Sequence, residues 1–198
     1  RGLHDAYHRI LKEGKQFLCC TTRGGASPLL CRQGETCRTG GFTEMLRHVN
    51  CGIVFQEIPN EITLSINISN CPCHCPGCHS SYLWDDIGEE LNENTINTFM
   101  KKYGDDITCL CFMGGDASPS DVERLALYIH SVYPGIKVGW YSGRQNIAKG
   151  IHKENFDYIK LGPYIKHLGA LKKKTTNQRL YKKIADGSFQ DITSIFWK

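Results

Sequence analysis

The chain has 198 residues, of which 40% are hydrophobic, and a formal net charge of +4, so it is long enough for one sizeable core and too short for two ordinary domains. It contains no apolar stretch of the roughly 20 residues that a membrane-spanning helix needs, and no secretory signal opens it, so we expect a cytoplasmic protein without a membrane partner. Because no basic, aromatic-rich surface can be inferred, we do not expect nucleic acid as a partner.

Residues 1–44 differ from the rest of the chain. They carry seven Lys and Arg against four Asp and Glu, with Gly, Thr and Arg interspersed and little apolar periodicity. We predict that they form an N-terminal extension that is disordered or not native, and that a chain beginning at Met45 folds alone. Residues 45–198 would then be the functional domain.

A regular pattern begins after Met45. Residues 62–68 alternate between apolar and polar side chains, which predicts a half-buried strand that runs directly into a group of cysteines. A short helix is predicted over residues 94–103, and a buried strand over residues 107–113 that ends at Gly114.

The second half continues this alternation. Ser120 and Glu123 form a capping box, and apolar residues then repeat at helical spacing as far as Tyr133. A strand over 136–141, a short helix over 145–151 and a strand over 158–161 follow. This pattern predicts an α/β fold with a mostly parallel sheet. Ligands of such sheets gather beyond the carboxyl ends of the strands, where the cysteines, Gly114–Asp116 and Ser142–Gly143 all fall.

Four of the eleven cysteines lie within eight positions, at Cys71, Cys73, Cys75 and Cys78. The first, third and fourth have the spacing Cys-x3-Cys-x2-Cys. Three thiolates can bind three corners of a cubane cluster and leave one iron without a protein ligand. A small molecule that offers an amine and a carboxylate could chelate that iron. We interpret Cys73 as a bystander thiol.

Two other interpretations of these residues stay open. One is a zinc site, for which Cys73, His74 or His79 would supply a fourth ligand. The other is a redox dithiol formed by Cys75 and Cys78, although it leaves Cys71 unexplained. Elsewhere, Cys109 and Cys111 are two apart on a predicted strand and so share one face, where we expect them to pack in the core.

With its position after a strand, the cysteine loop resembles the signature of the radical S-adenosylmethionine superfamily. More narrowly, residues 45–198 resemble the activating proteins of anaerobic ribonucleoside-triphosphate reductase. The matching elements are Met45-Leu46-Arg47, the cysteine loop, Leu83-Trp84, Gly114-Gly115-Asp116 and Thr176-Asn177-Gln178-Arg179.

This resemblance implies a partial (βα) barrel that holds a 4Fe–4S cluster and S-adenosylmethionine. Its metal ligands would be Cys71, Cys75 and Cys78, with no catalytic residue beyond the cluster and cofactor ligands. The residues expected to contact the cofactor are Gly77, His79, Gly114, Gly115, Asp116 and Ser142.

The implied activity is reductive cleavage of S-adenosylmethionine, which places a glycyl radical on the reductase. The implied partners are that reductase and a reduced flavodoxin- or ferredoxin-type electron donor. The alternatives are a radical enzyme with a small-molecule substrate, of the deazapurine synthesis type, and a noncatalytic zinc or redox module.

Overall fold

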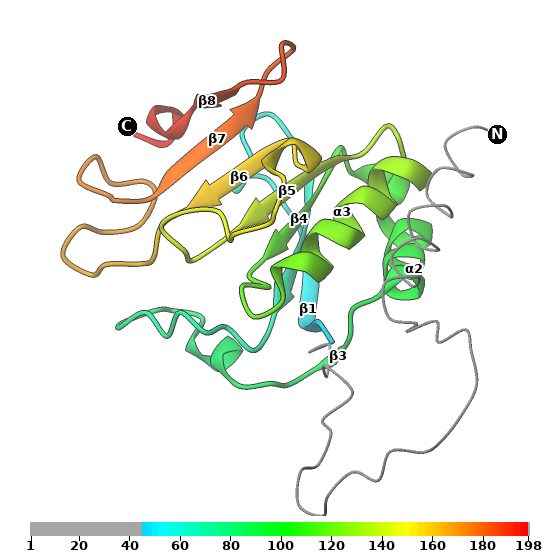
Figure 1. Cartoon of the computed structure of the whole chain (residues 1–198), viewed down its shortest axis with the longest axis horizontal. Coiled ribbons are helices and arrows are strands. Elements are labelled where there is room, and N and C mark those ends of the chain that lie inside the picture. The colour runs from blue at the N-terminus through cyan, green and yellow to red at the C-terminus, as the bar shows by residue number, and fades with distance from the viewer. Residues whose placement is uncertain (1–44, 198) are drawn as a thin grey trace, which may run out of the picture. The chain divides into compact units, whose positions relative to one another are not determined.

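The computed structural model describes residues 45–197, so the predicted extension over residues 1–44 lies outside the described residues. Eight strands form one sheet in the order β3-β1-β2-β4-β5-β6-β7-β8 (Figure 1). Their bounds are β1 Arg47–Val54, β2 Thr63–Ile68, β3 Glu89–Glu90, β4 Cys109–Met113, β5 Lys137–Tyr141, β6 Tyr158–Leu161, β7 Arg179–Lys183 and β8 Phe189–Asp191. Two α-helices accompany the sheet, α2 (Glu93–Tyr103) and α3 (Pro119–Val132).

The sheet is mixed and open. Strands β2, β4, β5 and β6 are parallel to one another, whereas β1 and β3 on one side and β7 and β8 on the other pair antiparallel. The α/β class is confirmed, but the prediction of a mostly parallel sheet is wrong, because three of the seven pairings are parallel and four are antiparallel. The parallel strands form the centre of the sheet.

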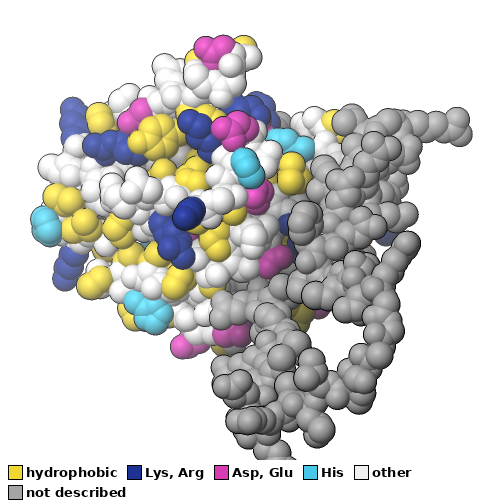
Figure 2. All heavy atoms as spheres, viewed as in Figure 1, with side chains coloured by type: hydrophobic (Ala, Val, Ile, Leu, Met, Phe, Trp, Pro, Cys, Tyr) yellow, Lys and Arg dark blue, Asp and Glu magenta, His cyan; other side chains and the backbone are white. Residues whose placement is uncertain are grey.

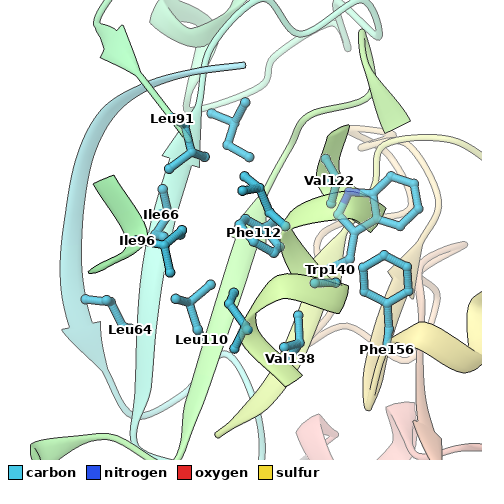
Figure 3. Close-up of a cluster of buried hydrophobic side chains, with 14 of the residues drawn as sticks. Leu64, Ile66, Leu91, Ile96, Leu110, Phe112, Val122, Val138, Trp140 and Phe156 are labelled. Carbon is cyan, nitrogen blue, oxygen red and sulfur yellow. The ribbon is translucent and has the colours of Figure 1, made fainter. Parts of the chain in front are cut away.

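Both helices pack on one face of this sheet. Successive strand residues point to opposite faces, so Leu110 and Phe112 of β4 face the helices while Cys109 and Cys111 face away. Figure 3 shows the helix-side core, in which Leu64 and Ile66 of β2 and Trp140 of β5 gather with apolar side chains of the helices and connecting segments. The other members labelled there are Leu91, Ile96, Val122, Val138 and Phe156.

A second apolar cluster covers the opposite face. It consists of Ile58, Cys109, Cys111, Tyr158, Leu180 and Ile192. Because both faces are covered, five of the six residues of β2 are buried, and only Asn67 is partly exposed. The predicted strand is therefore present, but the prediction that it is half-buried is wrong.

Two local predictions are also wrong. Helix α3 begins at Pro119, a residue well suited to the first helical position, so Ser120 is not the cap of a capping box. The Ser118 hydroxyl instead donates to Asp121 Oδ2 at 2.7 Å. No helix covers residues 145–151, where Gly150 has a φ of 85° that interrupts regular helix.

Four short 3₁₀ helices complete the described chain. They span Ser81–Trp84, Gly104–Asp106, Lys153–Asn155 and Thr193–Phe196. Neither α-helix of the described part is long and apolar enough to cross a membrane.

Candidate metal centre

A row of four side chains crosses the sheet where its parallel strands end. Strand register pairs Asn67 with Met113, Met113 with Tyr141, and Tyr141 with Lys160. All four line one cavity of about 630 Å³. Because they alternate with residues of the helix-side core, the cavity opens on the face opposite the helices.

The cysteine loop follows β2 and borders this cavity. The Cys71 backbone N–H donates to the Leu83 carbonyl at 2.9 Å, and the Cys78 N–H donates to the Cys75 carbonyl at 3.0 Å. Gly77 has a φ of 77°, a left-handed conformation that glycine adopts at no steric cost and that turns the chain before Cys78. Cys71, Cys73, Cys75 and Cys78 all line the cavity as free thiols.

Five of the six expected cofactor-binding residues also line the cavity, namely Gly77, His79, Gly114, Asp116 and Ser142. Gly115 does not. A Cβ atom on Gly115 would lie 2.4 Å from Val122 Cγ2 of α3, so this glycine lets the turn after β4 pack closely against the helix. The structure thus gives Gly115 a packing role on the core side.

Gly114 is held by backbone and indole contacts. Its N–H donates to the Tyr141 carbonyl at 3.0 Å, and its carbonyl accepts from Trp140 Nε1 at 2.8 Å. Its φ is 110°, and a Cβ atom would lie 3.0 Å from the Ile68 carbonyl oxygen. The carbonyl of Gly114, a residue that we expected to contact the cofactor, therefore already has a donor within the protein.

The Asp116 carboxylate connects the ends of β4 and β5. Its Oδ1 accepts from the Ser142 hydroxyl at 2.6 Å, and its Oδ2 accepts from the Gly143 N–H at 2.8 Å. The residue is 1% exposed, and its backbone carbonyl accepts from Arg144 Nη2 at 2.7 Å. Asp116 and Ser142 are thus brought together as predicted from their strand-end positions, with a direct role for Asp116 in holding the loop after β5.

The thiols of the loop differ electrostatically. A hydrogen bond from the Cys73 thiol lowers the pKa of Cys71 to about 6, whereas the same interaction raises the pKa of Cys73. This interaction favours the thiolate form of Cys71, which is the form that binds metals. The Cys73 Sγ atom also lies 3.8 Å from Asp116 Oδ2.

Lys160 is a cavity residue that the sequence analysis missed. It is 8% exposed, and its Nζ donates to the Gly162 carbonyl at 2.7 Å. Burial lowers the pKa of Lys160 to about 8, although the charges of Asp116 and the loop thiols oppose this change. The side chain is thus cationic at neutral pH and faces the cysteines. A lysine inside the apolar run of residues 158–161 was the available signal.

The two histidines of the loop have different surroundings. The His74 ring stacks on Trp84 with centroids 5.1 Å apart and planes 9° apart, and its φ is 41°. His79 is exposed, and its Nε2 lies 3.3 Å from the Ser80 hydroxyl. The aromatic stack orients the middle of the cysteine loop against the 3₁₀ helix that follows it.

The donor set fits a cluster that takes three cysteines. In the described part of the chain, Cys75 and Cys78 belong to no group of three ligand atoms close enough for a single ion. Three cysteine thiols that line one cavity are the kind of donor that a cubane cluster takes. The nearby Lys160 cation offsets part of the negative charge that three thiolates bring to the cavity.

Comparison with known protein families gives the same class of centre. Residues 62–160 match the family model of the 4Fe-4S single cluster domain. Since this segment is half of the chain, the protein belongs to that family, and the iron–sulfur part of the expectation is confirmed. A search of curated proteins and a search of solved structures find no match.

Proposed function

We propose that this protein is a radical S-adenosylmethionine enzyme that installs a glycyl radical on an anaerobic ribonucleoside-triphosphate reductase. The observation that carries the proposal is that Cys71, Cys75 and Cys78 border one cavity with Asp116 and Ser142 at the ends of parallel strands. A three-cysteine cluster at that point has an iron open to a ligand, and the cavity size lies in the ordinary range for small-molecule sites.

The arrangement of layers supports a partial (βα) barrel of the radical S-adenosylmethionine type. The central strands are parallel, both helices lie on one face, and the cavity lies on the other, as for the inside of an incomplete barrel. The antiparallel strands at both edges extend this core without altering where the parallel strands end.

Cys71, Cys75 and Cys78 would hold the cluster, which would supply the one electron needed to cleave S-adenosylmethionine into methionine and a 5′-deoxyadenosyl radical. The residues of the chain would bind S-adenosylmethionine and orient it beside the cluster. Lys160 supplies positive charge that favours a carboxylate in the cavity, and Asp116 keeps the loop after β5 in place. The apolar side chains of Leu83, Met113 and Leu171 exclude water from part of the cavity.

A glycine Cα–H of the reductase would be the hydrogen donor, which leaves 5′-deoxyadenosine and a glycyl radical. The sequence resemblance to the reductase activators supports this substrate. Glycine also suits the chemistry, because it has no side chain to hinder approach. A reduced flavodoxin- or ferredoxin-type protein would supply the electron.

The distribution of basic residues on this chain agrees with an electron-donor protein that has an acidic surface. Residues 158–185 contain eight Lys and Arg and no Asp or Glu. Within this stretch, Lys166 Cδ lies 3.7 Å from where a Cβ of Gly77 would be, so basic residues reach the cysteine loop. Figure 2 shows Lys and Arg side chains on the part of the surface near the β6–β7 connection. Such a field would steer an acidic partner toward the cavity.

Anaerobic assay of the reconstituted protein tests the proposal. With reductant, S-adenosylmethionine and the reductase, we expect 5′-deoxyadenosine and an electron paramagnetic resonance doublet from the remaining α-hydrogen of the radical glycine. The doublet should collapse when the reductase contains α-deuterated glycine. Cys78→Ala is the control that should give neither product.

Two results would contradict the proposal in different ways. Formation of 5′-deoxyadenosine without any glycyl signal would move the assignment to a radical enzyme with a small-molecule substrate. Stoichiometric zinc with no iron–sulfur absorbance after anaerobic reconstitution would favour a noncatalytic module.

A further inference from the structure

We propose that Cys71, Cys73 and Asp116 form a second metal site, which holds a single thiophilic divalent cation such as Zn²⁺ in the protein that lacks its cluster. Their ligand atoms all lie within 4.8 Å of one another, and no other such group of three occurs among residues 45–197. This site differs from the three-cysteine cluster site, because it uses Cys73 and a carboxylate in place of Cys75 and Cys78.

The three ligand atoms are close to the spacing that zinc requires. Tetrahedral zinc with Zn–S bonds of about 2.3 Å and Zn–O bonds of about 2.1 Å places its ligand atoms roughly 3.6–3.8 Å apart. The Cys73 Sγ and Asp116 Oδ2 atoms are already 3.8 Å apart. The remaining pairs need an inward shift of at most about 1 Å, which rotation of the thiols can supply.

The surroundings of Asp116 are those of a metal-binding carboxylate. Ser142 Oγ and the Gly143 N–H donate to its two oxygens, which fixes the carboxylate and leaves lone pairs for an ion on the Cys73 side. Hydrogen bonds of this kind orient the ligands of metal sites and strengthen binding. Gly143 contributes in a second way, because its lack of a Cβ leaves the space that the Cys73 thiol occupies.

Charge also favours a dication. In the metal-bound site, two thiolates and one carboxylate would carry three negative charges, of which a divalent ion would neutralise two; Asp116 is buried and both cysteines are partly exposed. Arg144 Nε, 3.7 Å from Asp116 Oδ1, offsets part of the third. Three protein ligands leave one tetrahedral position for water, as in zinc sites that exchange ligands.

The shared ligand makes the two metal sites exclusive. Cys71 belongs to both, so an ion held by Cys71, Cys73 and Asp116 must leave before the cluster can form. A function follows for Cys73, which the cluster does not need. It retains a metal ion in the empty loop and makes cluster assembly sensitive to zinc.

Titration of the full-length, cluster-free protein with Co²⁺ under anaerobic conditions tests this site, since Co²⁺ reports thiolate ligands by their charge-transfer absorption. We expect one equivalent to bind with that absorption. Cys73→Ala and Asp116→Asn should each weaken Co²⁺ binding at least tenfold, whereas the matched variants Cys75→Ala and Cys78→Ala should bind as the parent does. Far-ultraviolet circular dichroism of each variant checks that it is folded.

A cluster-assembly experiment tests the second metal site separately from the cluster site. One equivalent of Zn²⁺ added before reconstitution should slow iron uptake by the parent several-fold and have little effect on folded Cys73→Ala. Loss of Co²⁺ binding in Cys75→Ala and Cys78→Ala but not in Cys73→Ala would overturn the second site. So would the absence of thiolate-to-cobalt absorption in the parent. Neither result bears on whether the cluster forms, which iron and sulfide analysis measures independently.

Discussion

Gly143 and Cys73 approach so closely that a Cβ atom at residue 143 would lie 2.7 Å from the Cys73 Sγ atom and 3.1 Å from its Cβ. This contact joins the loop after β5 to the cysteine loop after β2. The Asp116 carboxylate lies beside this contact, because its Oδ2 would be 3.5 Å from a Cβ atom at residue 143. The cavity thus depends on a glycine that lies far from the cysteines in the sequence.

Gly143→Ala should displace the Cys73 side chain and lower the free energy of unfolding by about 1–3 kcal/mol, the usual cost of overpacking a filled site. Urea denaturation of the full-length protein measures this change. Gly135→Ala is the matched control, because nothing lies within 4 Å of its added Cβ. Equal effects of the two substitutions would show that the contact with Cys73 is not tight.

The cysteine series separates the three predicted cluster ligands from Cys73. After anaerobic reconstitution the parent should hold about four irons per chain. We expect Cys71→Ala, Cys75→Ala and Cys78→Ala each to lose most of the iron and its visible absorption, and Cys73→Ala to keep it. Iron and sulfide analysis provides the measurement. Retention of four irons by Cys75→Ala would remove that residue from the ligand set.

Asp116→Asn should weaken both the fold and the cofactor site. The amide can accept from Ser142 with its oxygen, but its NH₂ group then faces the Gly143 N–H, which loses its acceptor. A buried donor without a partner costs about 1–3 kcal/mol. We expect a loss of that size in urea denaturation and slower cleavage of S-adenosylmethionine at unchanged iron content. Asp105→Asn, at an exposed site, serves as the control. Identical cleavage rates in the two variants would mean that Asp116 holds the loop after β5 but does not affect the cofactor.

Lys160→Met should make the reduction potential of the cluster more negative. A buried cation beside the cysteines favours the reduced, more negative state, so its removal disfavours reduction. Redox titration followed by electron paramagnetic resonance measures the shift at equal iron content. Lys160→Arg should restore most of the potential, and exposed Lys149→Met should not change it. A potential unaltered in Lys160→Met would mean that the ammonium is too well shielded to act on the cluster.

Glu61→Gln tests a buried ionic group away from the cavity. Burial raises the pKa of Glu61, but hydrogen bonds from Lys137, Thr108 and Tyr158 outweigh it, so the pKa in the folded protein is lowered. The carboxylate therefore contributes stability above the unfolded-state pKa of about 4.3, and this contribution is lost as the pH falls through the lower folded-state value.

We expect Glu61→Gln to cost about 1–3 kcal/mol at pH 7 and less at pH 3.5. Urea denaturation at both pH values measures the difference. Glu154→Gln, at an exposed site, should change stability by less than about 0.5 kcal/mol at either pH. A cost for Glu61→Gln that does not shrink in acid would contradict the lowered pKa.

The central elements were predictable because their apolar residues repeat clearly. Strands β2, β4, β5 and β6 and helices α2 and α3 lie within two residues of the predicted bounds. Strand β7 was missed because four of its five residues are charged or aromatic and only Leu180 is buried. Strand β1 mixes Arg, His, Asn and Gly with apolar residues, so no period stands out.

Within the site, spacing along the chain predicts the three cysteine ligands, but contacts across the sheet could not be read from it. The row that brings Lys160 beside Tyr141 and Met113 depends on strand register. The closeness of Cys73 to Asp116 depends on where two loops fold. Gly115 packs against α3 and does not line the cavity, and the sequence does not show this because a glycine required by a helix and one required by a ligand look alike.

The two thiols of β4 have a practical consequence. Cys109 and Cys111 are fully buried, and burial raises the pKa of both thiols, so an alkylating reagent can reach them only when the sheet opens. The loop cysteines, by contrast, border an open cavity. Mass spectrometry of timed alkylation would therefore measure two rates in one molecule. Fast alkylation of the loop cysteines would report loss of metal, and slow alkylation of Cys109 and Cys111 would report global unfolding. The protein carries its own reporter of whether an inactive preparation has lost its metal or its fold.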